Sequence, residues 1–89
     1  MARVEIYTTM LCPFCWRAKK LLEERGATFQ EVDVMTDGSL RAEMRQRAGG
    51  RTSVPQIFIN GQHVGGCDEL YALDRAGKLT PMLQQQPAT

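Results

Sequence analysis

Long apolar runs, net charge and cysteine are all scarce in this sequence. No apolar segment approaches the roughly 20 residues that cross a lipid bilayer, and strand-like sequence begins within a few residues of Met1. Eleven basic and ten acidic side chains leave a formal charge of +1, so the composition does not favour a nucleic acid or an anionic membrane as a partner. A cytoplasmic protein is therefore our expectation.

The three cysteines are too few for a framework of structural disulfides, and two of them, Cys12 and Cys15, have the spacing of a redox pair. A chain of 89 residues with 43% hydrophobic and 24% charged side chains is typical of one globular domain. We find no repeat and no linker. The sequence predicts a single domain over residues 1–83 and a flexible C-terminal tail over residues 84–89.

The hydrophobic pattern predicts alternating strands and helices. Val4 and Ile6 fall on one face of the first strand and Tyr7 on the other, which is typical of a central strand covered on both sides. Asn60-Gly61 predicts a tight hairpin between the last two strands. Strands are expected over residues 3–8, 28–34, 56–59 and 62–64, and helices over residues 13–25, about 39–48 and about 67–76.

This order of elements, β-α-β-α-β-β-α, predicts an α/β domain of thioredoxin-like plan. The first two strands are expected to be parallel because a helix connects them, and the last two antiparallel because a tight turn connects them. The expected result is a four-stranded mixed sheet flanked by three helices, with Leu79 and Met82 docking on the core.

The motif Cys12-Pro13-Phe14-Cys15 lies where the first strand ends and the first helix begins. The first N–H groups of a helix lack acceptors and form its partially positive end, which stabilises an anion such as a thiolate. Pro13 suits the first helical position, so Cys12 becomes the capping residue and Cys15 lies one turn along, within reach of a disulfide. We interpret Cys12 as a nucleophile whose pKa lies below about 8.5, the value of a free thiol, and Cys15 as the resolving thiol.

Two other interpretations of the cysteines stay open at this point. They could be inert core residues. They could also be half of a metal site, because Cys12, Cys15, His63 and Cys67 give the spacing C-x₂-C followed by H-x₃-C, which resembles a set of zinc ligands.

Three motifs together resemble those of the glutaredoxins. They are the Cys-Pro-Phe-Cys motif, Ser53-Val54-Pro55 before the third strand, and Gly66-Cys67-Asp68 at the start of the last helix. The likeness runs from about Val4 to Leu83 and is greatest to the bacterial third-class dithiol glutaredoxins. The resemblance implies a thioredoxin-like fold and an enzyme that uses glutathione to reduce protein disulfides and glutathione mixed disulfides.

The resemblance also implies the partners. Glutathione would be a co-substrate, with no tightly bound cofactor and no metal, and the clients would be glutathionylated or disulfide-bonded proteins, ribonucleotide reductase among the candidates. We expect a monomer. Some glutaredoxins instead share an iron–sulfur cluster between two subunits through the first cysteine and two glutathiones, and a redoxin served by thioredoxin reductase is a further alternative.

We predict glutathione binding at eight residues, seven of them from the resemblance and Arg51 as a source of positive charge for the ligand. A cis peptide bond before Pro55 would present the Val54 backbone to the Cys12 sulfur, where an extended cysteinyl peptide would pair with it. The helix start would receive the γ-glutamyl end of glutathione, its carboxylate on backbone N–H groups and its ammonium on Asp68. The eight residues are Phe14, Arg51, Ser53, Val54, Pro55, Gly66, Cys67 and Asp68.

The sequence departs from the family pattern at two positions. Phe14 would form a wall of the glutathione groove, where the family often has tyrosine. Thr9 stands where many members carry a lysine that stabilises the thiolate and meets the glycyl carboxylate. Arg51 is predicted to serve the ligand instead, and Arg17 or Lys19 to add positive charge near the thiol.

Three of these positions also have a plain structural interpretation. Pro55 could be a trans proline that starts an edge strand. Asp68 could merely favour the helix dipole. Cys67 could be a small buried residue and not a site of oxidation or glutathionylation.

Overall fold

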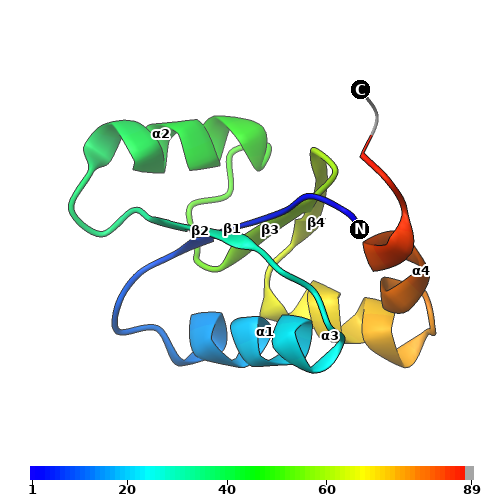
Figure 1. Cartoon of the computed structure of the whole chain (residues 1–89). Helices are drawn as coiled ribbons and strands as arrows, with labels where there is room; N and C mark the ends of the chain where they lie inside the picture. The colour runs from blue at the N-terminus through cyan, green and yellow to red at the C-terminus, as the bar shows by residue number, and fades with distance from the viewer. Residues whose placement is uncertain (88–89) are drawn as a thin grey trace.

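The computed structural model describes residues 1–87 and contains four strands and four helices in that range (Figure 1). The strands are β1 (Val4–Thr8), β2 (Gln30–Asp33), β3 (Gln56–Ile59) and β4 (Gln62–Gly65), and the helices are α1 (Pro13–Glu24), α2 (Gly38–Arg47), α3 (Cys67–Arg75) and α4 (Leu79–Gln84). The predicted α/β class and the order of the first seven elements are confirmed. Within residues 1–87, no helix combines the length and the apolar character that crossing a membrane requires.

The four strands form one mixed sheet in the order β2-β1-β3-β4. β1 and β2 are parallel and β3 and β4 antiparallel, as predicted, and β1 is antiparallel to β3. Asn60 and Gly61, with φ of 52° and 81°, make the tight turn between β3 and β4, because asparagine and glycine tolerate positive φ. β1 is therefore a central strand, and its C-terminal end leads into the loop that carries Cys12.

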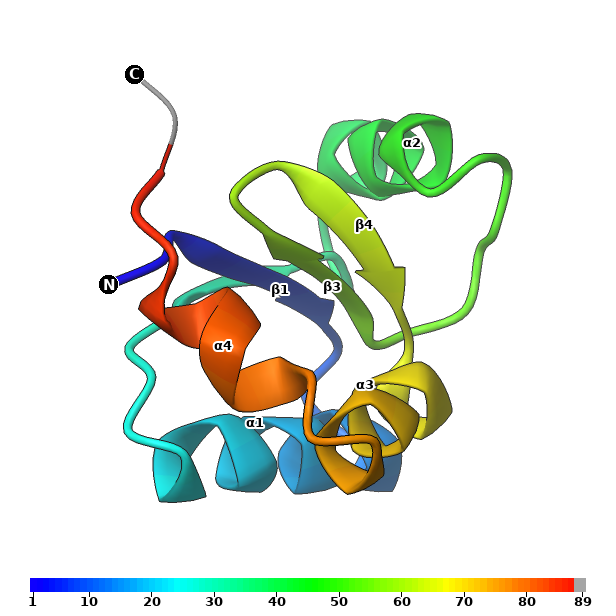
Figure 2. The same ribbon diagram turned by 90° about the vertical axis from the view of Figure 1, so that its right-hand side faces the viewer.

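Helices cover both faces of the sheet (Figures 1 and 2). α1, α3 and α4 lie on one face and α2 lies on the other. The larger of two apolar clusters contains Val4 and Ile6 together with residues of α1, α3 and α4, whereas Tyr7 belongs to a smaller cluster with Met44 of α2. The alternation predicted along β1 is thus confirmed, and it fixes which helices pack beside the cysteine loop.

Hydrogen-bonded charged side chains supplement the smaller cluster. The Tyr7 hydroxyl donates to Glu43 at 2.6 Å and accepts from Arg47 at 2.7 Å. The Arg47 guanidinium also donates to both carboxylate oxygens of Glu5, at 3.0 and 3.1 Å. Burial raises the pKa of Tyr7, and the bonds to Glu5 raise the pKa of Arg47, so the phenol stays neutral and the guanidinium charged. Polar contacts therefore tie α2 to β1.

The expectation of three helices is wrong by one, because α4 follows α3. α3 ends at Arg75, and Gly77 lies in the turn that follows it. Leu79 and Leu83 are one helical turn apart, and both are buried. Met82 packs against the same cluster, so the docking predicted for this segment takes helical form. α4 includes Gln84, the first residue of the predicted tail. The rest of the tail stays a prediction, and residues 88 and 89 lie outside the described residues.

The first residues of the chain lie beside the end of α4 (Figures 1 and 2). The Ala2 N–H donates to the Leu83 carbonyl at 2.9 Å, and the Asn60 side chain accepts from the Arg3 N–H at 2.8 Å and donates to the Gln85 carbonyl at 3.1 Å. Both segments are therefore held at the β3–β4 turn, at the opposite end of β1 from the cysteine loop.

Candidate active site

Cys12 occupies the N-cap position of α1, as predicted. Its backbone is extended, with φ of −120° and ψ of 105°, and Pro13 takes the first helical position. The Cys15 N–H donates to the Cys12 sulfur at 3.1 Å. This N–H is one of the first donors of the helix, which have no acceptor within it. The sulfur therefore lies where its anion gains a hydrogen bond and the positive end of α1.

Cys15 lies behind Cys12 and differs from it in exposure. The Cys15 side chain is 1% exposed, whereas Cys12 is partly exposed. Burial, and after it the hydrogen bond with Cys12, raises the pKa of the Cys15 thiol to about 12. Both cysteines are free thiols, so the site is in its reduced form. At neutral pH Cys15 keeps its proton, and Cys12 is the sulfur that an incoming disulfide can reach.

The loop before β3 approaches Cys12 through Val54. The peptide bond between Val54 and Pro55 is cis, as predicted, and the Cys12 thiol donates to the Val54 carbonyl oxygen at 3.8 Å, a distance at which only sulfur makes a hydrogen bond. Gln56 is fully buried, and its amide donates to the Ser53 carbonyl at 3.0 Å. A buried amide thus fixes the shape of the loop, a role for Gln56 that the sequence motifs do not reveal.

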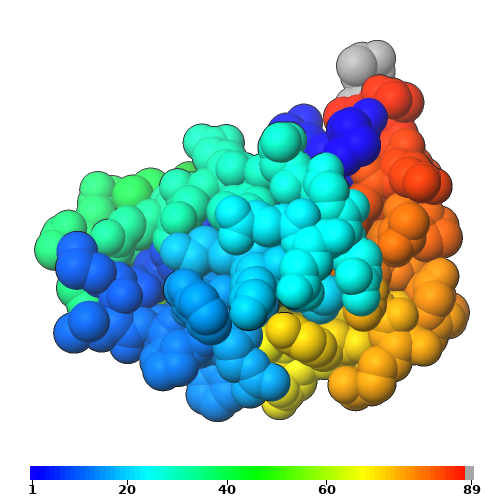
Figure 3. Space-filling model, turned by 60° about the horizontal axis from the view of Figure 1, so that its bottom comes forward, coloured from blue at the N-terminus to red at the C-terminus, as the bar shows by residue number. Residues whose placement is uncertain are grey.

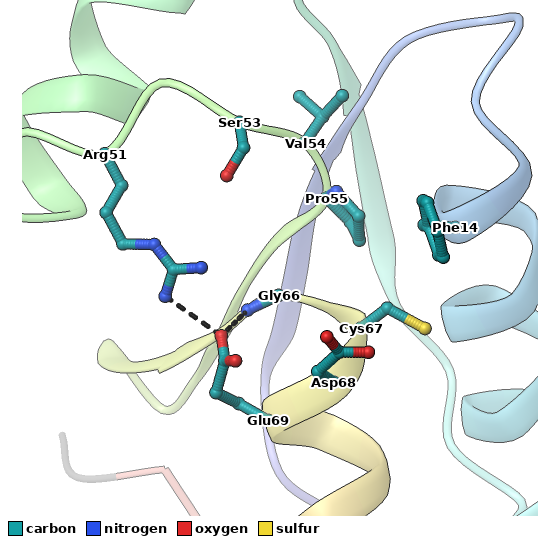
Figure 4. Close-up of a pocket in the computed structure, with 9 residues that line it drawn as sticks. All are labelled: Phe14, Arg51, Ser53, Val54, Pro55, Gly66, Cys67, Asp68 and Glu69. Atoms are coloured by element: carbon teal, nitrogen blue, oxygen red, sulfur yellow. Dashed lines mark hydrogen bonds and ion pairs between the residues drawn. The ribbon is translucent and has the colours of Figure 1, made fainter.

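A groove beside Cys12 is lined by residues from three separate segments (Figure 4). Phe14 comes from α1, residues 51–55 come from the loop before β3, and residues 66–69 come from the start of α3. The structure thus brings together every residue of the predicted binding set. The lining residues are Phe14, Arg51, Ser53, Val54, Pro55, Gly66, Cys67, Asp68 and Glu69.

Glu69 is the one lining residue that the sequence analysis missed. Its Oε1 accepts from the Gly66 N–H at 2.7 Å and from the Arg51 guanidinium at 2.9 Å (Figure 4). Both bonds lower the pKa of Glu69, and the bond from the Gly66 N–H has the larger effect. Glu69 therefore carries its charge at neutral pH. The available signal was its place three residues after the helix cap, where glutamate commonly binds the cap N–H.

The start of α3 forms one end of the groove. α3 begins at Cys67 with Gly66 as its N-cap, and no side chain caps its first turn. The N–H groups of Cys67 and Asp68 lie in that turn, where the helix itself offers no acceptor. Together with the Asp68 carboxylate, they are suited to a ligand that carries both a carboxylate and an ammonium group.

The Cys67 side chain does not share this role. It is 7% exposed and belongs to the larger apolar cluster, and burial raises the pKa of its thiol. Figure 4 shows its sulfur directed towards α1. These observations support the plain interpretation of Cys67 as a small buried residue whose backbone faces the groove.

A family model described as glutaredoxin matches residues 4–64, more than half of the chain. The chain belongs to the glutaredoxin family. Glutaredoxin 3 of Escherichia coli strain K12 is 56% identical over 84 residues, which are 94% of this chain and 100% of that protein. The resemblance to bacterial glutaredoxins inferred from the sequence is confirmed, and with it a glutathione-dependent thiol–disulfide oxidoreductase.

Solved structures of other glutaredoxins have the same fold. The solution structure of glutaredoxin from Brucella melitensis is 54% identical, with a TM-score of 0.83, and the match covers 94% of this chain and 90% of that one. The crystal structure of a buckwheat glutaredoxin–glutathione complex is 34% identical, with a TM-score of 0.84, and covers 92% and 76%. The thioredoxin-like fold expected for this glutaredoxin is thereby confirmed.

Exposed apolar side chains stand next to the two cysteines in the chain of this glutaredoxin. Met10, Leu11 and Trp16 are 77%, 84% and 61% exposed. In Figure 3 the blue segment that leads into α1 projects at one edge of the molecule. The Lys20 ammonium lies 5.3 Å from the centre of the Trp16 ring. A polypeptide joined to Cys12 would meet an apolar surface.

The basic side chains expected to add charge near Cys12 have partners elsewhere. The Lys19 ammonium lies 3.0 Å from Glu31, and the Arg17 guanidinium lies over the Tyr71 ring, 5.5 Å from its centre. The positive charge that faces the Cys12 sulfur is therefore that of the start of α1. Position 9 carries threonine and adds none.

The four residues of the zinc alternative do not come together. The His63 ring bonds the Gln56 side chain at 2.7 Å and packs against Phe58, with ring centres 5.0 Å apart. Within residues 1–87, no group of three or more histidine, cysteine, aspartate and glutamate side chains is placed to hold a metal ion. The geometry therefore favours the redox interpretation of Cys12 and Cys15.

Proposed function

We propose that this glutaredoxin uses Cys12 as its nucleophile, Cys15 as its resolving thiol and the groove of Figure 4 as its glutathione site. The observation that carries the proposal is the position of the Cys12 sulfur. It accepts from the Cys15 N–H at 3.1 Å and lies 3.8 Å from the carbonyl oxygen of Val54, a residue that lines that groove. A single ligand bound in the groove could therefore reach the Cys12 sulfur at the start of α1.

Glutathione mixed disulfides are the first proposed class of substrate. The Cys12 thiolate attacks the glutathione sulfur, a Cys12–glutathione disulfide forms, and the client protein leaves as a thiolate that takes up a proton. A second glutathione, as its thiolate, then attacks the glutathione sulfur held on Cys12. Oxidised glutathione leaves and the Cys12 thiolate is restored. Cys15 has no part in this cycle.

Protein disulfides are the second proposed class. The Cys12 thiolate attacks one client sulfur, and the other client sulfur leaves and takes up a proton. Cys15 then loses its proton and attacks the Cys12 sulfur, which releases the client's second thiol and forms the Cys12–Cys15 disulfide. This step is favoured because it is intramolecular. Two glutathiones reduce the new disulfide in turn.

The groove supplies distinct contacts for the parts of glutathione. The N–H groups of Cys67 and Asp68 are suited to the γ-glutamyl carboxylate and the Asp68 side chain to its ammonium. The Val54 backbone is suited to the cysteinyl residue, and Phe14 to a wall beside it. Arg51 would meet the glycyl carboxylate. The buckwheat glutaredoxin of similar fold, described as a glutathione complex, supports a glutathione site in this fold.

We further propose a monomer that acts in the cytoplasm on glutathionylated and disulfide-bonded proteins. A sequence with three cysteines, two of them at the spacing of a redox pair, suits a reducing compartment that supplies glutathione. The exposed Met10 and Leu11 suit a polypeptide client as much as a tripeptide. Ribonucleotide reductase stays a candidate client on the family resemblance alone.

The replacement Cys15→Ser tests this proposal. It should retain glutathione-dependent reduction of the mixed disulfide between glutathione and 2-mercaptoethanol, and lose turnover of an intramolecular protein disulfide, while Cys12→Ser loses both. Equal loss of both activities in Cys15→Ser would contradict the division of roles. Faster turnover with thioredoxin reductase than with glutathione would instead indicate a redoxin served by that reductase. An iron–sulfur absorption band in anaerobically purified protein would indicate a protein that binds a cluster.

A further inference from the structure

Arg51 lines the groove, and one acidic side chain holds its guanidinium in place. It follows α2 in the loop that leads to Val54, and its side chain is 44% exposed. Within residues 1–87, the acidic group that pairs with the Arg51 guanidinium is Glu69, at 2.9 Å. A long exposed arginine has many rotamers, so a ligand that binds it must otherwise meet the entropic cost of ordering it.

Glu69 is itself held in a single place. The Gly66 N–H donates to its Oε1 at 2.7 Å, so the side chain folds back over the start of α3. Gly65 has a φ of 119°, and a Cβ atom there would lie 2.9 Å from the Glu69 Cγ. Gly65, which has no Cβ, therefore leaves the space that the Glu69 side chain occupies.

The contact with Glu69 uses one edge of the Arg51 guanidinium and leaves its other N–H groups available to a ligand. Glu69 binds Arg51 through Nη1, and Arg51 Nη2 lies near Gly66, 3.7 Å from where a Cβ of that residue would be. Figure 4 shows the bonds of Glu69 to Arg51 and Gly66 at one end of the groove. A guanidinium has five N–H donors, so one carboxylate does not exhaust it.

We propose that Glu69 is a positioning residue that holds Arg51 over the groove for the glycyl carboxylate of glutathione. The inference rests on the proposed function, which assigns that carboxylate to Arg51. Glu69 acts through Arg51 and touches no reacting atom. It lowers the KM for substrates that carry the glycyl carboxylate and leaves kcat unchanged, because the sulfur chemistry at Cys12 is the same with and without it.

The test compares two mixed disulfides of 2-mercaptoethanol, one with glutathione and one with γ-glutamylcysteine, which lacks the glycyl carboxylate. Their KM ratio at saturating free glutathione reports the contact at Arg51. A hydrogen-bonded charge pair predicts a wild-type preference for the glutathione compound of about tenfold. Arg51→Ala and Glu69→Ala should each reduce this preference to near one at constant kcat, and the double variant should go no further.

Two further variants separate positioning from folding. Glu69→Gln keeps an oxygen that accepts from Gly66 and Arg51, so it should restore most of the preference. Asp74→Ala removes another arginine pair from the same helix, the one with Arg25, and should leave the ratio unchanged. The ¹⁵N order parameter of the Arg51 side chain should fall in Glu69→Ala, a change that a general loss of stability does not cause.

Each outcome has one meaning. If Arg51→Ala keeps the preference, the assignment of Arg51 in the proposed function fails. If Arg51→Ala removes it and Glu69→Ala keeps it, the positioning role fails alone. A lower KM in Glu69→Ala would show that Glu69 competes with the ligand, and multiplying effects in the double variant would show that Glu69 acts independently of Arg51. Either result overturns the inference.

Discussion

α1 and α3 both begin at the groove, and they use their first N–H groups in opposite ways. At the start of α1 the capping group is the reactive atom itself, since the Cys15 N–H donates to the Cys12 sulfur at 3.1 Å. At the start of α3 no side chain caps the first turn, and the backbone N–H from which Glu69 accepts there is that of Gly66, which precedes the helix. One helix start therefore holds a nucleophile, and the other is free to hold a ligand.

The same orphan donors can thus serve covalent chemistry or recognition, depending on what the cap residue provides. Changes at the start of α1 should affect the chemical step with every substrate. Changes at the start of α3 should affect binding of glutathione alone. The start of α2 offers a reference, because Asp37 caps it through Ser39 and Leu40 in the ordinary way.

The largest effect is expected from Cys12, because it serves as both nucleophile and cap. Cys12→Ser should abolish turnover of all disulfide substrates, yet keep the fold, since serine is among the preferred caps. Cys12→Ala should lose turnover and, in addition, about 1 kcal/mol of stability. Activity assays and urea unfolding of the two variants would test this, and equal stability would show that the sulfur does not cap α1.

A large difference in alkylation is expected between the two thiols of α1. With a pKa of about 12, Cys15 is ionised to only about one part in ten thousand at pH 8. Because the pKa is raised, the rate of its alkylation should grow about tenfold per pH unit between pH 8 and 10. Mass spectrometry after a pulse of iodoacetamide should find Cys12 labelled first. Preferential labelling of Cys15 would contradict its burial.

An intermediate effect is expected at the start of α3. Asp68→Asn removes a charge-assisted contact, so the KM for the glutathione mixed disulfide should rise about tenfold. The kcat should not change. Steady-state kinetics at saturating free glutathione measure both quantities, and a fall in kcat with constant KM would show that the start of α3 takes part in the chemical step.

The smallest effect is expected at the start of α2. Asp37→Ala should lower the melting temperature slightly, because two N–H groups lose their acceptor. The KM for the glutathione mixed disulfide should stay at its wild-type value, since Asp37 does not line the groove. A changed KM would mean that the three helix starts are not independent.

Motifs at the boundaries of elements were the most predictable part of the molecule. Cys12, Pro55 and Gly66 each stand where a strand or helix begins or ends, and their local chemistry indicates that position. The C-terminal ends of β1 and β4, which lead to Cys12 and to α3, then lie at the same end of the sheet because β3 is antiparallel to both strands. The Asn60-Gly61 turn was predictable for the same reason, since two adjacent residues decide it.

Contacts between distant polar side chains were not predictable. Glu69 and Arg51 are 18 positions apart, and nothing in the sequence pairs them. Arg47 reads as one of several exposed charges on α2, yet it bonds Glu5 and the buried Tyr7. Such pairs depend on distances that exist only in the folded chain, whereas hydrophobic periodicity reports burial alone.

The pairing of the first residues with the end of α4, at the β3–β4 turn, has a practical consequence. A short linker could join these two segments, and a circularly permuted protein could begin in the loop between β2 and α2, where Met35 is 45% exposed. A reporter domain attached before Ala2 or after Gln85 would stand away from the Cys12 sulfur by about the 17 Å that a five-residue strand spans. The molecule therefore accepts labels and tethers without obstruction of its chemistry.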